Sequence, residues 1–155
     1  MARQIVLRQL SDGARSRAQL ADKLRQRGCP DDVAARVLDR MTEVGLIDDA
    51  SYARLLVSTR HEGRGLARRA LAHELRVKGV APELGAEALA TVSDEKERDR
   101  ARALVDKRLR SLHGLPAHVQ ARRLAGMLAR KGYSGEVAFG VITDAIGDAL
   151  EHRRD

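Results

Sequence analysis

The feature that most constrains the fold of this chain is an internal repeat. Three stretches, which begin at Leu20, Leu71 and Leu124, align with one another without a gap at offsets of 51 and 53 residues. The aligned columns are Leu20/Leu71/Leu124, Leu24/Leu75/Leu128, Gly28/Gly79/Gly132, Val33/Leu84/Val137 and Leu38/Leu89/Ile142. Chance explains a leucine column far better than a glycine column, so the chain is predicted to consist of tandem structural repeats.

Each aligned stretch predicts two helices around a tight turn. Leu20 and Leu24 stand four residues apart and therefore share one helix face. Gly28 follows where many helices end in a left-handed residue, and Cys29 can fold back over the last turn. Carboxylates then begin the second helix, where they meet the positive end of its dipole. The column of Cys29 also holds Val80 and Tyr133, and the carboxylates are Asp32, Glu83 and Glu136.

One more helical segment precedes each pair. These first helices are predicted over residues 2–10, 49–61 and 94–112. Gly45 ends the helix before the second segment, and Asp48 can cap its start. The third segment begins at Asp94 with Glu97 three residues later, which is capping-box spacing.

We therefore predict an all-α fold of three tandem three-helix repeats, nine helices in all, that form an elongated, curved array. The predicted repeats span residues 1–47, 48–93 and 94–149, and residues 150–155 form a short C-terminal tail. A three-helix unit of about 50 residues buries little apolar surface alone, so neighbouring repeats should stack.

Composition excludes several classes of protein. The only aromatic residues are Tyr52, Tyr133 and Phe139, so the core must be aliphatic. No apolar run approaches the roughly 20 residues that span a bilayer. The N-terminal residues MARQIVLRQL lack the apolar stretch of a signal peptide, and the single cysteine, Cys29, forms no intramolecular disulfide. We expect a cytoplasmic protein with no membrane partner.

No arrangement of residues predicts catalysis. The five histidines are scattered and form no metal-ligand pair, and the glycines occur singly, not in a phosphate-binding loop. Cys29 occupies a column that holds Val80 and Tyr133, which favours a packing role over a nucleophilic one. We predict that the protein is not an enzyme and has no metal site and no cofactor.

Charge is segregated by helix position. The chain has a net charge of +7. The middle helices, predicted over 16–27, 65–78 and 120–131, carry +3, +3 and +4, whereas the third helices, predicted over 31–43, 82–92 and 134–149, carry −2, −2 and −3. A row of basic helices indicates an anionic partner.

Two explanations of the basic helices compete. Lys78 and Lys131 complement the negative ends of their helix dipoles, as a solvated structural face would. Arginines near the helix starts stand at the unfavourable end of the dipole, and they favour a binding stripe. The expected partner- or nucleic-acid-binding residues are Arg17, Arg68, Arg69, Arg76, Lys78, Arg122, Arg123 and Lys131.

The short turn between the middle and third helix of each repeat also suggests a helix-turn-helix motif. In that motif the later helix enters the major groove of DNA. Here the later helix is acidic, so phosphate repulsion opposes such an insertion. Contact of the middle helices with a phosphate backbone or with an acidic protein groove stays open.

The central part of the chain contains the run GLIDDASYARLLVSTR, followed by a basic segment with Gly65 and by ALAHELRVKGV. These segments resemble the RecX family of bacterial regulators. Elements that recur in that family correspond here to Gly45, Asp48 with Asp49, Tyr52 with Ala53, and Glu74, Leu75, Lys78 with Gly79. The flanking repeats agree, so the resemblance covers about residues 2–147.

The resemblance implies a protein that binds RecA and lies in the helical groove of the RecA–single-stranded DNA filament. It implies inhibition of the RecA ATPase, strand exchange and LexA-cleaving coprotease activity in recombination and the SOS response. Weak binding to single- or double-stranded DNA is also associated with the family. A long repeating groove suits several modest contacts whose combined affinity exceeds that of any one. We expect a monomer. The alternatives are an independent helix-turn-helix DNA-binding protein and a structural adaptor that binds no nucleic acid.

Overall fold

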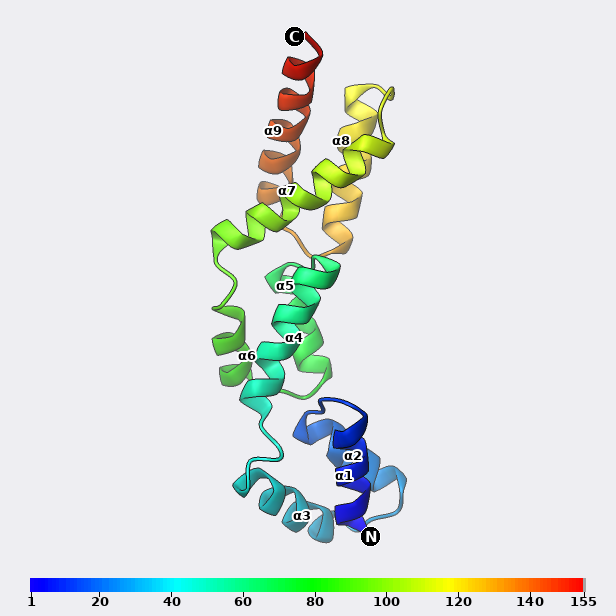
Figure 1. Cartoon of the computed structure of the whole chain (residues 1–155), viewed down its shortest axis with the longest axis vertical. Coiled ribbons are helices and arrows are strands. Elements are labelled where there is room, and N and C mark those ends of the chain that lie inside the picture. Colours follow the sequence, from blue (N-terminus) through cyan, green and yellow to red (C-terminus); the bar gives the residue numbers. More distant parts are fainter. Residues whose placement is uncertain (155) are drawn as a thin grey trace. The chain divides into compact units, whose positions relative to one another are not determined.

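The computed structural model describes residues 1–154, and over that range it contains nine α-helices and no strand (Figure 1). The helices are α1 (Ala2–Asp12), α2 (Arg17–Gln26), α3 (Asp31–Glu43), α4 (Asp49–Arg64), α5 (Arg68–Val77), α6 (Pro82–Leu89), α7 (Asp94–Ser111), α8 (Ala117–Arg130) and α9 (Gly135–Arg154). The predicted all-α class and the order of three helices per repeat are confirmed. The elongated, curved array stays a prediction.

Several helix boundaries differ from those expected. Helix α4 continues to Arg64 because Gly63 is tolerated inside it, and Gly65, at φ 69°, makes the turn that follows. Helix α8 begins earlier than expected, at Ala117, after an N-cap at Pro116, whose missing N–H removes no hydrogen bond from the helix. Helix α9 runs through to Arg154, so the residues expected as a tail from 150 onward extend this helix; residue 155 lies outside the described residues.

The chain divides into two compact units. Unit 1 comprises residues 1–57 and 72–89, and unit 2 comprises residues 58–71 and the described residues from 90 onward. One core in unit 1 contains Val6, Leu20, Leu24, Ala34, Leu38, Met41 and Ile47. The core of unit 2 contains Ala101, Val105, Leu112, Leu124, Leu128, Tyr133 and Ile142, among others. Both cores are almost wholly aliphatic, as the composition predicts.

All three glycine turns have the same hydrogen-bond pattern. Gly28, Gly79 and Gly132 have φ values of 80°, 77° and 92°. In the first turn the Gly28 N–H donates to the Arg25 carbonyl, and the Cys29 N–H donates to the Leu24 carbonyl, both at 3.0 Å. The other two turns repeat these bonds. This is a Schellman motif, which ends each middle helix and turns the chain into the third helix.

Repeat 3 has the longest first helix, and polar contacts tie it to the other two. Helix α7 packs along α9 (Figure 1), and Arg102 of α7 donates to Asp148 of α9 at 2.8 Å. That hydrogen bond, together with one to Asp106, raises the pKa of Arg102. The buried Gln120 of α8 donates to the Leu112 carbonyl at 3.0 Å and satisfies the C-terminal end of α7.

Candidate partner-binding surface

The start of α2 and the glycine turn after α5 form a junction within unit 1. Ser16 is fully buried, and its Oγ donates to the Lys78 carbonyl at 2.5 Å. Ser16 also forms a capping box with Gln19. A Cβ atom added to Gly79 would overlap the Cβ of Ala18. The glycine therefore permits the close approach of two repeats, besides ending α5.

A carboxylate from α4 completes this junction. Asp49 Oδ1 accepts a hydrogen bond from the Arg17 backbone N–H at 2.8 Å, so the next repeat caps the first turn of α2. The Arg17 guanidinium donates to Asp39 Oδ1 at 2.6 Å and lies 3.4 Å from Thr42 Oγ1. Arg17 thus has partners within unit 1, although it stands at a helix start.

Unit 2 contains the equivalent junction between α5 and the glycine turn after α8. The Ala67 N–H donates to the Lys131 carbonyl at 2.9 Å, and Lys131 Nζ donates to the Arg64 carbonyl at 2.8 Å. The Tyr133 hydroxyl donates to the Gly65 carbonyl at 2.8 Å. A Cβ atom on Gly132 would lie 2.8 Å from both the backbone N and the Cβ of Ala70. The same column of glycines therefore makes room for the preceding repeat in both units.

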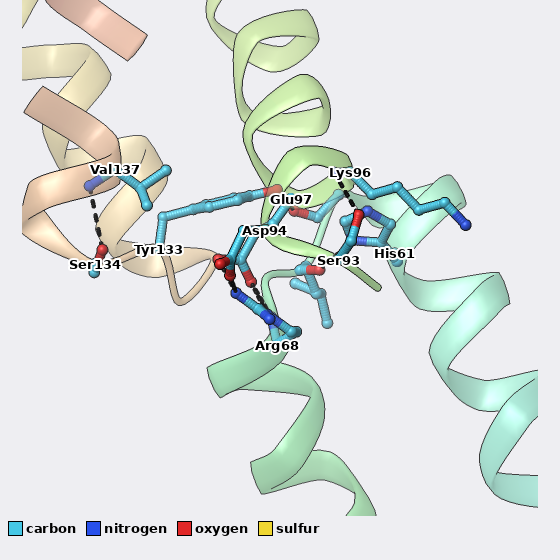
Figure 2. A network of polar contacts seen from close by, with 11 residues as sticks. His61, Arg68, Ser93, Asp94, Lys96, Glu97, Tyr133, Ser134 and Val137 are labelled. Carbon is cyan, nitrogen blue, oxygen red and sulfur yellow. Dashed lines mark hydrogen bonds and ion pairs between the residues drawn. The ribbon is translucent and has the colours of Figure 1, made fainter. Parts of the chain in front are cut away.

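An acidic cluster caps α5 in this junction, as Figure 2 shows. Glu97 Oε2 accepts from the Arg68 backbone N–H at 2.9 Å and from Arg68 Nε at 3.1 Å. The guanidinium also donates to Asp94 Oδ1. The bonds to Glu97 and then Asp94 raise the pKa of Arg68, and the bond from Arg68 holds the pKa of Asp94 below its usual value. The side chain of Glu97 is only 10% exposed, so this is a partly buried ion pair.

Two more buried polar groups lie beside the cluster. Burial raises the pKa of Tyr133 to about 12. The Nδ1 atom of His61 lies 2.8 Å from the Leu66 carbonyl, which places the proton of a neutral ring on Nδ1. Every buried side-chain nitrogen or oxygen in the described part of the chain has a hydrogen-bond partner. The junction is therefore a hydrogen-bonded network in which each buried side-chain polar atom of the described residues has a partner.

The structure separates the eight expected binding residues into three groups. Three of them, Arg17, Arg68 and Lys131, direct their side chains to partners within the chain. Lys78 is half-buried, and its carbonyl belongs to the unit 1 junction. The others are exposed and form no ion pair with the described residues: Arg69, Arg76, Arg122 and Arg123.

The exposed arginines occupy related positions. Arg69 and Arg76 are seven residues apart on α5 and therefore share one face. Arg122 on α8 occupies the same repeat column as Arg69, and Arg123 is adjacent to it. Four exposed cations on middle helices can donate to phosphate or carboxylate groups.

Sequence reasoning missed the residues that hold the junctions together. The capping box predicted from Asp94 to Glu97 is wrong: α7 is capped by Ser93, whose Oγ accepts from the Lys96 N–H at 3.1 Å, and Glu97 binds Arg68 instead. Ser16 had a detectable signal, a Ser followed three residues later by Gln. Glu97 had none, because its partner lies in the preceding repeat.

Residues 1–154, which the structure describes, contain neither a clustered set of metal ligands nor a helix that could span a membrane. No group of three or more His, Cys, Asp or Glu residues there is placed to hold a metal ion. None of the helices described has the length and apolar character that a membrane-spanning helix needs. Cys29 is half-buried and packs against the core of unit 1, in agreement with its expected packing role.

The helices and junctions define a class, the all-α proteins of tandem three-helix repeats. Family models described as the first, second and third three-helix domains of RecX match residues 2–41, 48–89 and 95–142. The chain therefore belongs to the RecX family.

Known relatives agree with this assignment. The regulatory protein RecX of Streptomyces lividans is 50% identical over 157 residues, which cover 99% of this chain and 84% of that protein. That of Thermobifida fusca is 49% identical over 145 residues, 94% of this chain and 78% of the relative. These relatives are named as regulatory proteins and not as enzymes.

Solved structures show the same fold. A crystal structure of RecX from Lactobacillus salivarius has a TM-score of 0.83 at 21% identity and covers 93% of this chain and 94% of its own. A second crystal structure, of a regulatory protein RecX, has a TM-score of 0.79 at 25% identity and covers 92% of this chain and 70% of its own.

Proposed function

We propose that this protein is a non-enzymatic, cytoplasmic regulator that binds RecA and the RecA–single-stranded DNA filament. In this proposal it inhibits the RecA ATPase, strand exchange and coprotease activity in recombination and the SOS response. Membership of a family of regulatory proteins supports the general role. The observation that carries the proposal is the set of four exposed arginines on α5 and α8 that have no ion-pair partner among the described residues.

In this proposal the basic residues of the middle helices have two different roles. Arg69, Arg76, Arg122 and Arg123 would meet the acidic groups of the filament directly. Arg17, Arg68 and Lys131 would act indirectly, because their hydrogen bonds hold the middle helices against neighbouring repeats. Repeat 2 (residues 48–93) and repeat 3 (from residue 94) would each supply two of the exposed arginines, and one monomer would combine their modest contacts.

Charge reversal tests this proposal. The variant with Arg69, Arg76, Arg122 and Arg123 changed to Glu is expected to inhibit RecA-driven ATP hydrolysis on single-stranded DNA at least about tenfold less strongly, since several charge-assisted contacts become repulsive. Arg8, Arg54, Arg108 and Arg110 changed to Glu provide a control with the same net charge at exposed positions on the first helices. Circular dichroism checks that both variants keep their helix content. Equal inhibition by the two variants would contradict the proposed surface.

Direct DNA binding is the second candidate, since the same four arginines suit phosphate oxygens. Such binding predicts a slope of log K against log salt of about −0.9 for each phosphate neutralised on duplex DNA. Tight, sequence-selective duplex binding in the absence of RecA would favour this candidate over the filament regulator. The acidic third helices, such as α6 with Glu83 and Glu87, oppose it.

A further inference from the structure

Helix α3 of repeat 1 leaves an apolar groove open in unit 1. The groove has a volume of about 470 Å³, and its floor is formed by Val33, Val37, Met41, Val44 and Leu46. Val44 and Leu46 are 51% and 49% exposed. Clustered aliphatic side chains at this exposure mark a binding surface more often than isolated ones do.

The groove is open because the first helix of repeat 1 covers less of the third helix than the first helix of repeat 3 does. Helix α1 has 11 residues, whereas α7 has 18 and packs more extensively along α9 than α1 does along α3. At the column of Val44, repeat 3 has Asp148, which Arg102 of α7 binds at 2.8 Å. Repeat 1 has neither this polar link nor a first helix long enough to supply it.

The charges around the groove all have one sign. Arg3, Arg36 and Arg40 line it, and no carboxylate does. Arg36 lies 3.9 Å from Asp32, and Arg40 lies 3.4 Å from Glu43. Both ion pairs are solvent-exposed and therefore weak, so these guanidinium groups can bind other carboxylates.

This face is specific to repeat 1. The columns of Arg36 and Arg40 hold Glu87 and Thr91 in repeat 2 and Gly140 and Asp144 in repeat 3. The third helix of repeat 1 is acidic in total, but its groove face is basic. A pair of arginines on the third helix therefore occurs at these columns in repeat 1 alone.

We propose that this groove binds an acidic amphipathic helix of a protein partner. Apolar side chains spaced three and four residues apart would lie on the floor, and carboxylates beside them would meet the three arginines. Single-stranded nucleic acid fits the groove poorly, since the floor offers no aromatic ring on which a base could stack. Symmetric pairing of two copies through this face would bring arginine against arginine. The proposal is independent of the contact with RecA.

The test uses the full chain and a fluorescent peptide of about 16 residues, with leucines on one helix face and glutamates elsewhere. A peptide of the same composition in scrambled order is the control, and fluorescence anisotropy measures binding. We expect saturable binding of the amphipathic peptide only. Changing Val44 and Leu46 to Asp, or Arg36 and Arg40 to Glu, should weaken it at least about tenfold.

Matched variants separate the groove from nonspecific effects. Leu55→Asp alters a leucine of similar exposure on α4 and should leave the affinity unchanged. Arg36→Lys with Arg40→Lys preserves the charge and should retain most of the binding. Circular dichroism verifies folding, and exposed positions such as Val44 and Leu46 should tolerate substitution.

Four results would overturn the proposal. They are no binding of the amphipathic peptide, equal binding of the scrambled peptide, binding that the groove variants leave unchanged, and a dimer of the wild type in light scattering that V44D/L46D dissociates. The last result would assign the groove to a second copy of the chain.

Discussion

The junctions in unit 1 and unit 2 join the same two structural elements, but different side chains make the contacts. In both, the start of a middle helix meets the glycine turn of the following repeat, and an acidic residue from a first helix caps that start. Unit 1 uses the Ser16 hydroxyl and the short carboxylate of Asp49. Unit 2 uses the Ala67 backbone N–H and the longer, nearly buried carboxylate of Glu97.

The two junctions share some parts and differ in others. The glycine and the acceptor carbonyl of the lysine before it occur in both, since no other residue type permits both the positive φ and the close approach. The group that donates to the lysine carbonyl differs between the junctions, and so does the capping acid. Either carboxylate can cap the helix, because each accepts a hydrogen bond from a first-turn backbone N–H. Unit 2 adds Tyr133 and Lys131, and its junction should accordingly be the more strongly held.

The largest expected effect is at the glycine column. Gly132→Ala should lower the free energy of unfolding by about 3–4 kcal/mol, because left-handed strain adds to an overlap with Ala70. Gly28→Ala should cost only about 1 kcal/mol, since nothing lies within 4 Å of its added Cβ. Urea denaturation of the two variants measures the difference. Equal losses would show that the glycines serve only to end the helices.

A smaller effect is expected from Tyr133 at alkaline pH. Its pKa is about 12 in the folded protein against 10.0 for an ordinary tyrosine, so the folded state holds the proton more tightly. The corresponding stabilisation is present below pH 10 and falls by about 2–3 kcal/mol as the pH rises through 12. Absorbance titration of a Tyr52→Phe variant reports the ionisation of Tyr133 alone. A midpoint near pH 10 would contradict the burial of the Tyr133 hydroxyl.

The two capping acids should differ in the next experiment. Glu97→Gln should destabilise the protein by about 2 kcal/mol, since Arg68 loses a partly buried ionic partner. Asp49→Asn should cost less, about 0.5–1 kcal/mol, because an amide oxygen still accepts from the Arg17 N–H. Thermal and urea unfolding give both values. A larger loss for Asp49→Asn would reverse the ranking of the two junctions.

The smallest effect concerns Asp94, whose carboxylate is largely exposed. Arg68 lowers the pKa of Asp94 in the folded protein below its ordinary value of 3.8. The carboxylate of Asp94 therefore stabilises the fold above pH 3.8, and this stabilisation is lost as the pH falls through the lower pKa of the folded state. Asp94→Asn should therefore flatten the acid side of the stability profile slightly. Asp99→Asn, an exposed change on the same helix, removes the same charge at another position and is the control.

The sequence predicted the fold better than the surface. The leucine and glycine columns report local helix periodicity and helix ends, so the nine helices followed from spacing alone. The partners of Arg17 and Arg68 are 22 to 32 residues away, and they meet only when the helices pack together. Position at a helix start therefore could not distinguish Arg68, which is bound within the chain, from Arg69, which is exposed beside it.

The glycine turn of repeat 1 has a consequence for protein engineering. Each junction has an acceptor half, the turn, and a donor half, the start of a middle helix. At Gly28, unlike at Gly79 and Gly132, no atom of another repeat lies within 4 Å of an added Cβ. In repeat 3 the donor half is absent, because α8 begins at Ala117, four residues before the Arg17/Arg68 column reaches Ala121. An engineered repeat placed before repeat 1 could therefore pack its middle helix on the turn at Gly28. A repeat placed after repeat 3 would first require a shorter α8.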